Sequence, residues 1–164
     1  MLSFSADEIF KIGMEIELNG KAFYKAAAEL CKDKEVRAVI EHLRDEEARH
    51  YDVFSGMREK LPESAKTETV FDPDDEMALY IKALADSRVF TNEKEAVNQA
   101  KSCKNPAEIF RIALGFEKDT ILMFESMKKV TKAEWGQAKV DRLIEEEKEH
   151  IRKISAALGK IKKV

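Results

Sequence analysis

The chain has 164 residues, with 29 basic and 32 acidic side chains and a formal net charge of -3 at pH 7. This length suits one domain with one core, and the intermixed charges form no basic patch for binding nucleic acid. No apolar run approaches the ~18 residues of a membrane span and no signal-peptide pattern opens the chain, so we expect a cytoplasmic protein without a membrane partner.

The first 60 residues predict two long helices. Ser5-Ala6-Asp7-Glu8 is a capping box, and the helix that it opens carries one apolar stripe to about residue 30. Asp33 is the predicted N-cap of a second helix that runs to about residue 60. A connection this short makes the two helices antiparallel neighbours, so residues 5–60 form a helical hairpin.

Residues 61–105 are expected to cross back along the molecule. A helix of about 27 residues rises about 40 Å, and the 45 residues of this segment can return that distance while forming short helices. Asp72-Pro73-Asp74-Asp75 predicts the start of one short helix at about 73–86. Thr91-Asn92 predicts the start of another at about 93–102.

Two more long helices are predicted in the last third of the chain. Asn105-Pro106-Ala107-Glu108 has an N-cap residue, a proline at the first helical position and a glutamate at the third, and the helix continues to about Val130. Thr131-Lys132-Ala133-Glu134 is a further capping box, which predicts that the fourth helix begins there and ends near Leu158, before Gly159. Residues 105–159 thus form a second hairpin within a single domain of residues 1–164.

The two hairpins are similar in sequence at an offset of one hundred residues. Thirteen of the 53 positions from 8 to 60 are identical to the residue one hundred further on. Asp45-Glu46-Glu47-Ala48-Arg49-His50 returns as Glu145-Glu146-Glu147-Lys148-Glu149-His150, and in each copy a Glu and a His three residues apart share one helix face. A lone glutamate in an apolar stripe, Glu17 or Glu117, precedes each pair by thirty residues.

This duplicated pattern predicts a site for two metal ions. Buried carboxylates are strongly unfavourable unless cations neutralise them. Each half supplies two carboxylates and one imidazole as predicted ligands: Glu17, Glu47, His50, Glu117, Glu147 and His150. Such ligands suit Fe(II), Mn(II) and, less selectively, Zn(II). Because a site of this kind can bind dioxygen or peroxide between two irons, iron is the expected metal, with manganese and zinc as alternatives. Without metal, we expect burial and mutual repulsion to raise the pKa values of all four glutamates.

Other polar side chains near these motifs allow two interpretations. Tyr24 lies two turns after Glu17 on the same face, either as a core tyrosine or as a phenol that hydrogen-bonds near the metals or passes an electron. Its counterpart in the other half is Phe124. Further glutamates in the motifs are either solvated or orient the ligand histidines: Glu46, Glu146 and Glu149. His42 is expected at the surface.

With these residues identified, the chain resembles the ferritin-like superfamily, and most of all the erythrin domain of rubrerythrins. The residues that carry the resemblance are Glu17 with Tyr24, Glu47-Ala48-Arg49-His50, Glu117, and Glu147-Lys148-Glu149-His150. The resemblance implies an all-α, ferritin-like four-helix bundle with one long crossover between the second and third long helices. It also implies a di-iron carboxylate centre, with Tyr24 as a candidate catalytic residue beside the ligands.

By the same resemblance, the expected function is reduction of hydrogen peroxide or dioxygen at two iron ions. Two alternatives stay open: an iron-binding protein with ferroxidase activity and little turnover, and a structural helical module held together by metal. Cys31 and Cys103 form no Cys-x-x-Cys motif, which excludes a rubredoxin-type iron site, and Thr120 stands where rubrerythrins tend to carry another glutamate. We therefore expect an external electron donor, such as a rubredoxin-type protein, and by analogy a homodimer.

Overall fold

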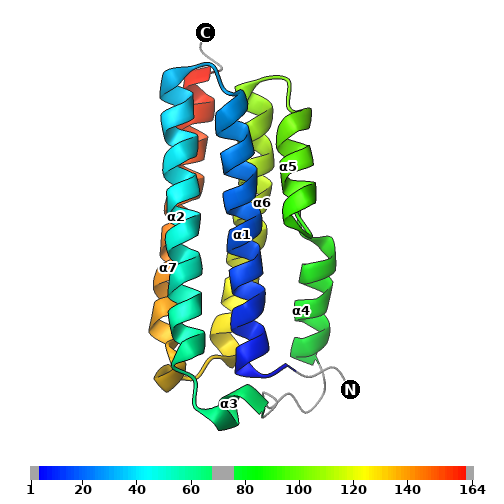
Figure 1. The fold of residues 1–164 in the computed structure, drawn as a ribbon, viewed down its shortest axis with the longest axis vertical. Coiled ribbons are helices and arrows are strands. Elements are labelled where there is room, and N and C mark those ends of the chain that lie inside the picture. Colours follow the sequence, from blue (N-terminus) through cyan, green and yellow to red (C-terminus); the bar gives the residue numbers. More distant parts are fainter. Residues whose placement is uncertain (1–3, 68–75, 162–164) are drawn as a thin grey trace.

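The computed structural model describes residues 4–67 and 76–161, and its elements are all helices. Four long helices lie side by side in Figure 1: α1 (Ala6–Leu30), α2 (Lys34–Glu59), α6 (Pro106–Val130) and α7 (Gln137–Ile161). α1 packs against α2 and α6 packs against α7 as antiparallel pairs, while α2 and α6 run in the same direction along the bundle (Figure 1). The predicted all-α four-helix bundle with one long crossover is confirmed.

Local capping sets the starts of three long helices, as the sequence predicts. The backbone N–H of Glu8 donates to Ser5 Oγ at 3.2 Å, and the backbone N–H of Ser5 donates to Glu8 Oε2 at 2.8 Å. The carboxylate of Asp33 accepts hydrogen bonds from the second and third residues of α2, and the side chain of Asn105 accepts one from Glu108 of α6. These bonds satisfy backbone donors that have no partner within the helix.

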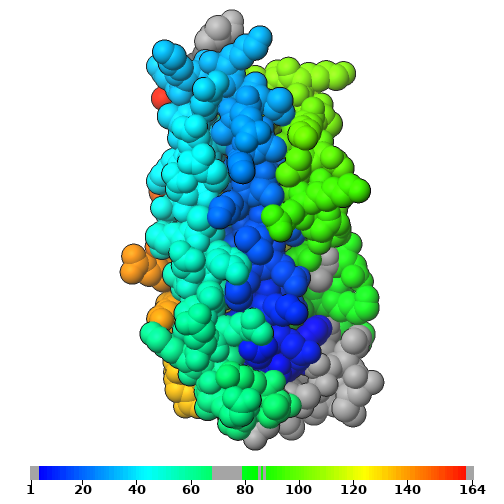
Figure 2. All heavy atoms as spheres, viewed as in Figure 1, coloured from blue at the N-terminus to red at the C-terminus, as the bar shows by residue number. Residues whose placement is uncertain are grey.

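The connection between α2 and α6 contains three short helices, α3 (Glu63–Thr67), α4 (Glu76–Ser87) and α5 (Glu93–Ser102). α4 packs on α6 and α5 packs on α1, so the crossover covers one side of the bundle (Figure 1). Figure 2 shows α1 between α2 and α5 on one face. The prediction of a helix at 93–102 is confirmed, α3 was not predicted, and the predicted cap at 72–75 lies outside the described residues.

The fourth long helix begins later than the sequence predicts. Thr131 is the C-cap of α6, and its hydroxyl donates to the carbonyl oxygen of Met127 at 2.7 Å, so it does not cap the next helix. A 3-10 turn, η1 (Ala133–Trp135), follows, and Gly136 has a φ of 105°, a conformation that glycine adopts without a steric penalty. α7 starts at Gln137 and continues through Gly159 to Ile161. Both predicted ends of this helix were therefore wrong.

Aromatic side chains pack on both sides of the bundle's centre. The ring of Phe54 lies 6.3 Å from that of Phe10 and 5.0 Å from that of Phe124. A second group joins Phe90 to Phe23 and to Phe116, at 4.9 and 5.0 Å. Two leucines of these helices, Leu30 and Leu122, are about half exposed, at 50% and 46%. Among the described residues, no helix is long and apolar enough to cross a membrane.

Candidate metal centre

The structure brings all six predicted ligands together inside the bundle. None of the six side chains is more than 1% exposed. The lone glutamates come from α1 and α6, and each Glu-x-x-His pair comes from α2 or α7, where its spacing places both side chains on the inner face. The six residues are Glu17 (α1), Glu47 and His50 (α2), Glu117 (α6), and Glu147 and His150 (α7).

These side chains form two overlapping groups, each able to hold one metal ion. One group contains Glu17 and His50, the other contains Glu117 and His150, and both contain Glu47 and Glu147. Within each group the candidate ligand atoms lie within 4.8 Å of one another. Each ion would therefore meet three carboxylates and one imidazole, with two of the carboxylates placed to bridge the ions. The arrangement fits a di-metal site.

Glu147 lies between the two histidines. Nδ1 of His50 is 2.7 Å from Glu147 Oε1, and Nδ1 of His150 is 2.8 Å from Glu147 Oε2. The two imidazole rings are nearly parallel, with an interplanar angle of 16° and centroids 5.4 Å apart. Both Nδ1 atoms therefore face the interior carboxylates, which is the orientation that lets each histidine share an ion with them.

The candidate ligand atoms are buried, yet almost none has a hydrogen-bond partner in residues 4–67 and 76–161. The short His–Glu contacts are close enough for ion pairs, but their directions do not form hydrogen bonds. A buried carboxylate without a partner costs several kcal/mol, and two divalent cations would balance four such charges. The atoms without a partner are both carboxylate oxygens of Glu17, Glu47 and Glu147, Oε2 of Glu117, and Nδ1 of His50 and His150. This donor set fits metal ions.

Gly20 makes room for one of these carboxylates. A Cβ atom at this position would overlap Oε2 of Glu47 and would lie 2.6 Å from Cζ of Phe116. Gly20 was not among the predicted site residues. The sequence feature that could have indicated it is a glycine on an apolar helix face, three residues after Glu17. Its counterpart in the second half of the repeat is Thr120.

The four carboxylates differ in their electrostatics. Burial raises the pKa of Glu17 and raises that of Glu47 well above its ordinary value, and other carboxylates add to the shift of Glu47. Burial and the charge of Glu147 raise the pKa of Glu117 to about 8. Although burial alone would raise it, contacts with the two histidines lower the pKa of Glu147. The expectation of four raised pKa values was therefore wrong for Glu147.

The same contacts raise the pKa values of the two histidines. Although burial alone would lower it, Glu17 and Glu147 raise the pKa of His50 to about 11. Glu117 and Glu147 likewise raise the pKa of His150 to about 10 against the effect of burial. Both rings thus carry an extra proton at neutral pH, and a metal ion must displace it from Nδ1 in order to bind.

Tyr24 is in contact with one of the predicted ligands. Its side chain is fully buried, and its hydroxyl donates a hydrogen bond to Oε1 of Glu117. Burial and the nearby charge of Glu117 raise the pKa of Tyr24 well above 10, so the phenol keeps its proton. The other oxygen of Glu117 lies 3.4 Å from Nδ1 of His150. Tyr24 is therefore placed beside the centre and also packs in the core.

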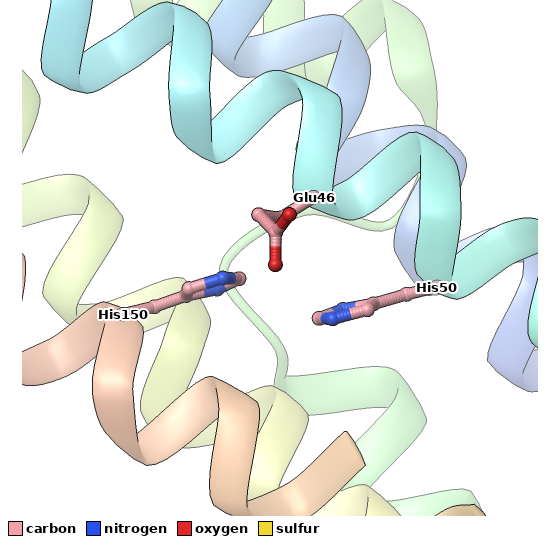
Figure 3. A group of neighbouring side chains, drawn as sticks. All are labelled: Glu46, His50 and His150. Carbon is pink, nitrogen blue, oxygen red and sulfur yellow. The ribbon is translucent and has the colours of Figure 1, made fainter.

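Arg49 joins α2 to α7 beside the histidines. Its Nη2 donates to Glu46 Oε2 at 2.8 Å and to Glu146 Oε2 at 2.6 Å. The same oxygen of Glu146 lies 3.1 Å from Nε2 of His50. In Figure 3, Glu46 points toward the space between the rings of His50 and His150. Glu146 is thus a residue that contacts a ligand histidine, one of the two interpretations that the sequence left open.

Two further polar residues lie away from the centre. Glu149 is about half exposed and pairs with Arg152 at 2.6 Å. His42 is exposed, as predicted, and its Nε2 lies 2.7 Å from Nζ of Lys153. The role of Arg49 was not predicted, although it stands directly before His50 where the other half has Glu149.

Comparison with known proteins supports the fold. No protein-family model and no curated protein sequence matches the chain. Among solved structures, the chain is similar to the 2.30 Å crystal structure of a Thermotoga maritima protein described as a candidate ferritin-like diiron-carboxylate protein. The TM-score is 0.74 at 21% sequence identity, and the similarity covers 96% of this chain and 97% of that chain. At this identity the similarity shows the fold alone, which confirms the ferritin-like bundle.

Proposed function

We propose that this protein is a rubrerythrin-like di-iron oxidoreductase that reduces hydrogen peroxide or dioxygen with electrons from an external donor. The observation that carries the proposal is the set of six buried side chains from four helices, whose ligand atoms face one another almost without hydrogen bonds. The name of the similar Thermotoga maritima protein, a candidate diiron-carboxylate protein, supports the choice of iron.

Each residue has a role in this proposal. Glu17 and His50 would hold one ion, Glu117 and His150 would hold the other, and two glutamates that belong to both groups would be shared: Glu47 and Glu147. Two bound iron ions can each supply one electron, and together they supply the two electrons that reduction of a peroxide requires. Tyr24 keeps a proton on its hydroxyl and orients the carboxylate of Glu117 through their hydrogen bond.

The burial of the site supports a small substrate. The six ligand side chains are at most 1% exposed, and aromatic rings pack along the bundle on either side. A substrate must reach this closed interior without a wide channel, and dioxygen and hydrogen peroxide are small enough to do so. Burial also strengthens electrostatic interactions at the site and limits side reactions with water.

Stopped-flow mixing of the Fe(II)-loaded protein with hydrogen peroxide and, separately, with dioxygen tests this function. We expect peroxide to oxidise the iron faster than dioxygen, and an added reductant to restore the Fe(II) form for repeated turnover. Preference for dioxygen followed by release of ferric iron would instead indicate ferroxidase activity, and no oxidation by either would indicate a structural metal site. Glu117→Ala should abolish the reaction, while Glu149→Ala, at the surface, should retain it.

The partners are part of the proposal and come from the resemblance. A homodimer is tested by sedimentation of the metal-loaded protein over a range of concentrations. An external donor is tested by peroxide turnover with a reduced rubredoxin-type protein, compared with turnover under a chemical reductant of similar potential. Faster turnover with the protein donor would support a specific electron-transfer surface.

A further inference from the structure

The internal repeat relates the two halves of the candidate centre, but two contacts break its symmetry. We call Glu17 with His50 the His50 subsite and Glu117 with His150 the His150 subsite; the other two glutamates belong to both. Two pairs of matching positions carry different residues: Arg49 corresponds to Glu149, and Tyr24 corresponds to Phe124. Each difference changes the surroundings of one subsite only.

The first difference supports the histidine of the His50 subsite. Nε2 of His50 lies 3.1 Å from Oε2 of Glu146. That carboxylate is held by two guanidinium groups, since Arg49 donates to Oε2 at 2.6 Å and Arg142 donates to Oε1 at 3.0 Å. A fixed acceptor at Nε2 keeps the proton there, leaves Nδ1 free to bind metal, and raises the ring's basicity as a ligand.

His150 has no such support. Its Nε2 is buried and has no hydrogen-bond partner among the residues that the structure describes. The acceptor that would match Glu146 is Glu46, which accepts a hydrogen bond from Arg49 at 2.8 Å but forms none with Nε2 of His150. At the position that matches Arg49, Glu149 turns outward to Arg152. The ring of His150 is therefore less firmly oriented as a ligand.

The second difference weakens the carboxylate of the His150 subsite. The hydroxyl of Tyr24 donates to Oε1 of Glu117, a ligand that only this subsite uses. This bond engages Oε1 of Glu117 and leaves only Oε2 without a hydrogen-bond partner and available to a metal ion. Within the described part of the chain, neither oxygen of Glu17 has a hydrogen-bond partner, and Phe124 at the position matching Tyr24 has no hydroxyl to donate. Both differences therefore favour metal at the His50 subsite.

We propose that the two subsites fill in a fixed order: the first metal ion binds at the His50 subsite and the second binds more weakly at the His150 subsite. Glu146 and Arg49 act as positioning residues for His50. The inference rests on the proposed di-metal function. Removal of a partner that orients a ligand histidine lowers metal affinity about 10- to 100-fold, so the two subsites are expected to differ by about 10-fold or more.

A third ion beside the rings is a less favourable interpretation of the same region. Glu46, His50 and His150 lie near enough to hold a cation (Figure 3). However, the guanidinium group of Arg49 already neutralises Glu46 and Glu146 at 2.8 and 2.6 Å. A cation there would have to displace Arg49, whereas the interior carboxylates have no such partner.

A Zn(II) titration followed by ¹⁵N NMR of the histidine rings tests the order. The chain has three histidines, and the exposed His42 serves as an internal reference that His42→Gln assigns. We expect the first equivalent of Zn(II) to shift Nδ1 of His50, the second to shift Nδ1 of His150, and neither to shift His42. The two ions would share two carboxylates, so the second ion should bind more weakly wherever the first one binds. The test of the proposed order is therefore which histidine ring responds first.

Three variants identify the cause. Glu146→Gln should weaken the first step about 10-fold and make the two rings respond together. Tyr24→Phe should strengthen the second step and leave the first unchanged, and phenylalanine is tolerated at the matching position 124. Glu149→Gln, the surface control, should change neither step.

The outcomes separate the order from the function. If His150 responds first, if both rings respond together in the wild type, or if Glu146→Gln moves the His150 step alone, the inferred order is wrong while two ions still bind. If no Zn(II) binds at either ring, the proposed di-metal function itself is wrong.

Discussion

His50 on α2 and Glu147 on α7 meet in the interior, with Nδ1 of His50 2.7 Å from Oε1 of Glu147. His150 approaches the other oxygen of the same carboxylate at 2.8 Å. Contacts with the two histidines lower the pKa of Glu147 against the effect of burial, whereas the pKa values of the other three buried glutamates are raised. Glu147 is thus the nearest carboxylate to both buried histidines, which makes its removal different from that of Glu47.

The first prediction compares Glu147→Ala with Glu47→Ala in the absence of added metal. Glu147→Ala should destabilise the fold by about 3 kcal/mol, because it removes the nearest anionic partner of two buried histidines. Glu47→Ala should cost at most about 1 kcal/mol, because the pKa of Glu47 is raised well above its ordinary value by burial and by repulsion from other carboxylates. Urea unfolding at pH 7 in the presence of a chelator measures both values, and equal losses would contradict the prediction.

The second prediction concerns stabilisation by metal. At a free concentration 100 times its Kd, Fe(II) or Mn(II) should stabilise the wild type by about 2.7 kcal/mol. Glu47→Ala should lose most of this gain, because Glu47 belongs to both candidate metal groups. Melting temperatures measured under anaerobic conditions, with and without the metal, provide the comparison. Glu149→Ala is the control that should keep the full gain; an equal gain in Glu47→Ala would show that Glu47 is not a ligand.

The third prediction concerns pH. Neighbouring carboxylates raise the pKa of His50 to about 11 and that of His150 to about 10, so both rings hold an extra proton throughout the neutral range. Burial raises the pKa of Glu117 to about 8. Because metal must displace these protons, its apparent affinity should increase as pH rises from 6 to 8 and fall as pH drops.

Proton release provides the measurement for this pH dependence. Calorimetric titration with Mn(II) in buffers of different ionisation enthalpy counts the protons released on binding. We expect at least two protons for two ions, one from each histidine. Binding without proton release, or an affinity that is constant across this pH range, would show that the histidines are not ligands.

The fourth prediction uses two glycines in long helices. Gly20→Ala introduces a Cβ atom that overlaps Oε2 of Glu47 and lies 2.6 Å from the ring of Phe116, so it should displace the carboxylate and weaken metal binding about 10-fold or more. At Gly56, no atom lies within 4 Å of the added Cβ, and Gly56→Ala should stabilise the helix by about 0.5–1 kcal/mol without affecting metal. Circular dichroism melts and metal titrations compare the variants, and equal metal binding in both would contradict the assigned role of Gly20.

The sequence alone predicted the helices whose signals are local. Ser5, Asp33 and Asn105 cap helices where the capping patterns predict, because an N-cap bonds to backbone groups two or three residues away. The spacing of the duplicated motifs also predicted that six particular side chains share the inner faces of four helices, and the structure buries all six together. Both predictions succeed because helical periodicity relates sequence spacing directly to one face.

Other features depend on contacts between segments that are distant in sequence. The bond between Tyr24 and Glu117 and the contact between Glu146 and His50 join different helices. The low pKa of Glu147 arises from two histidines on two helices. Sequence spacing determines which face of a helix a side chain occupies, but only the packing of the helices determines which side chains meet, and electrostatic and hydrogen-bond energies depend on those distances.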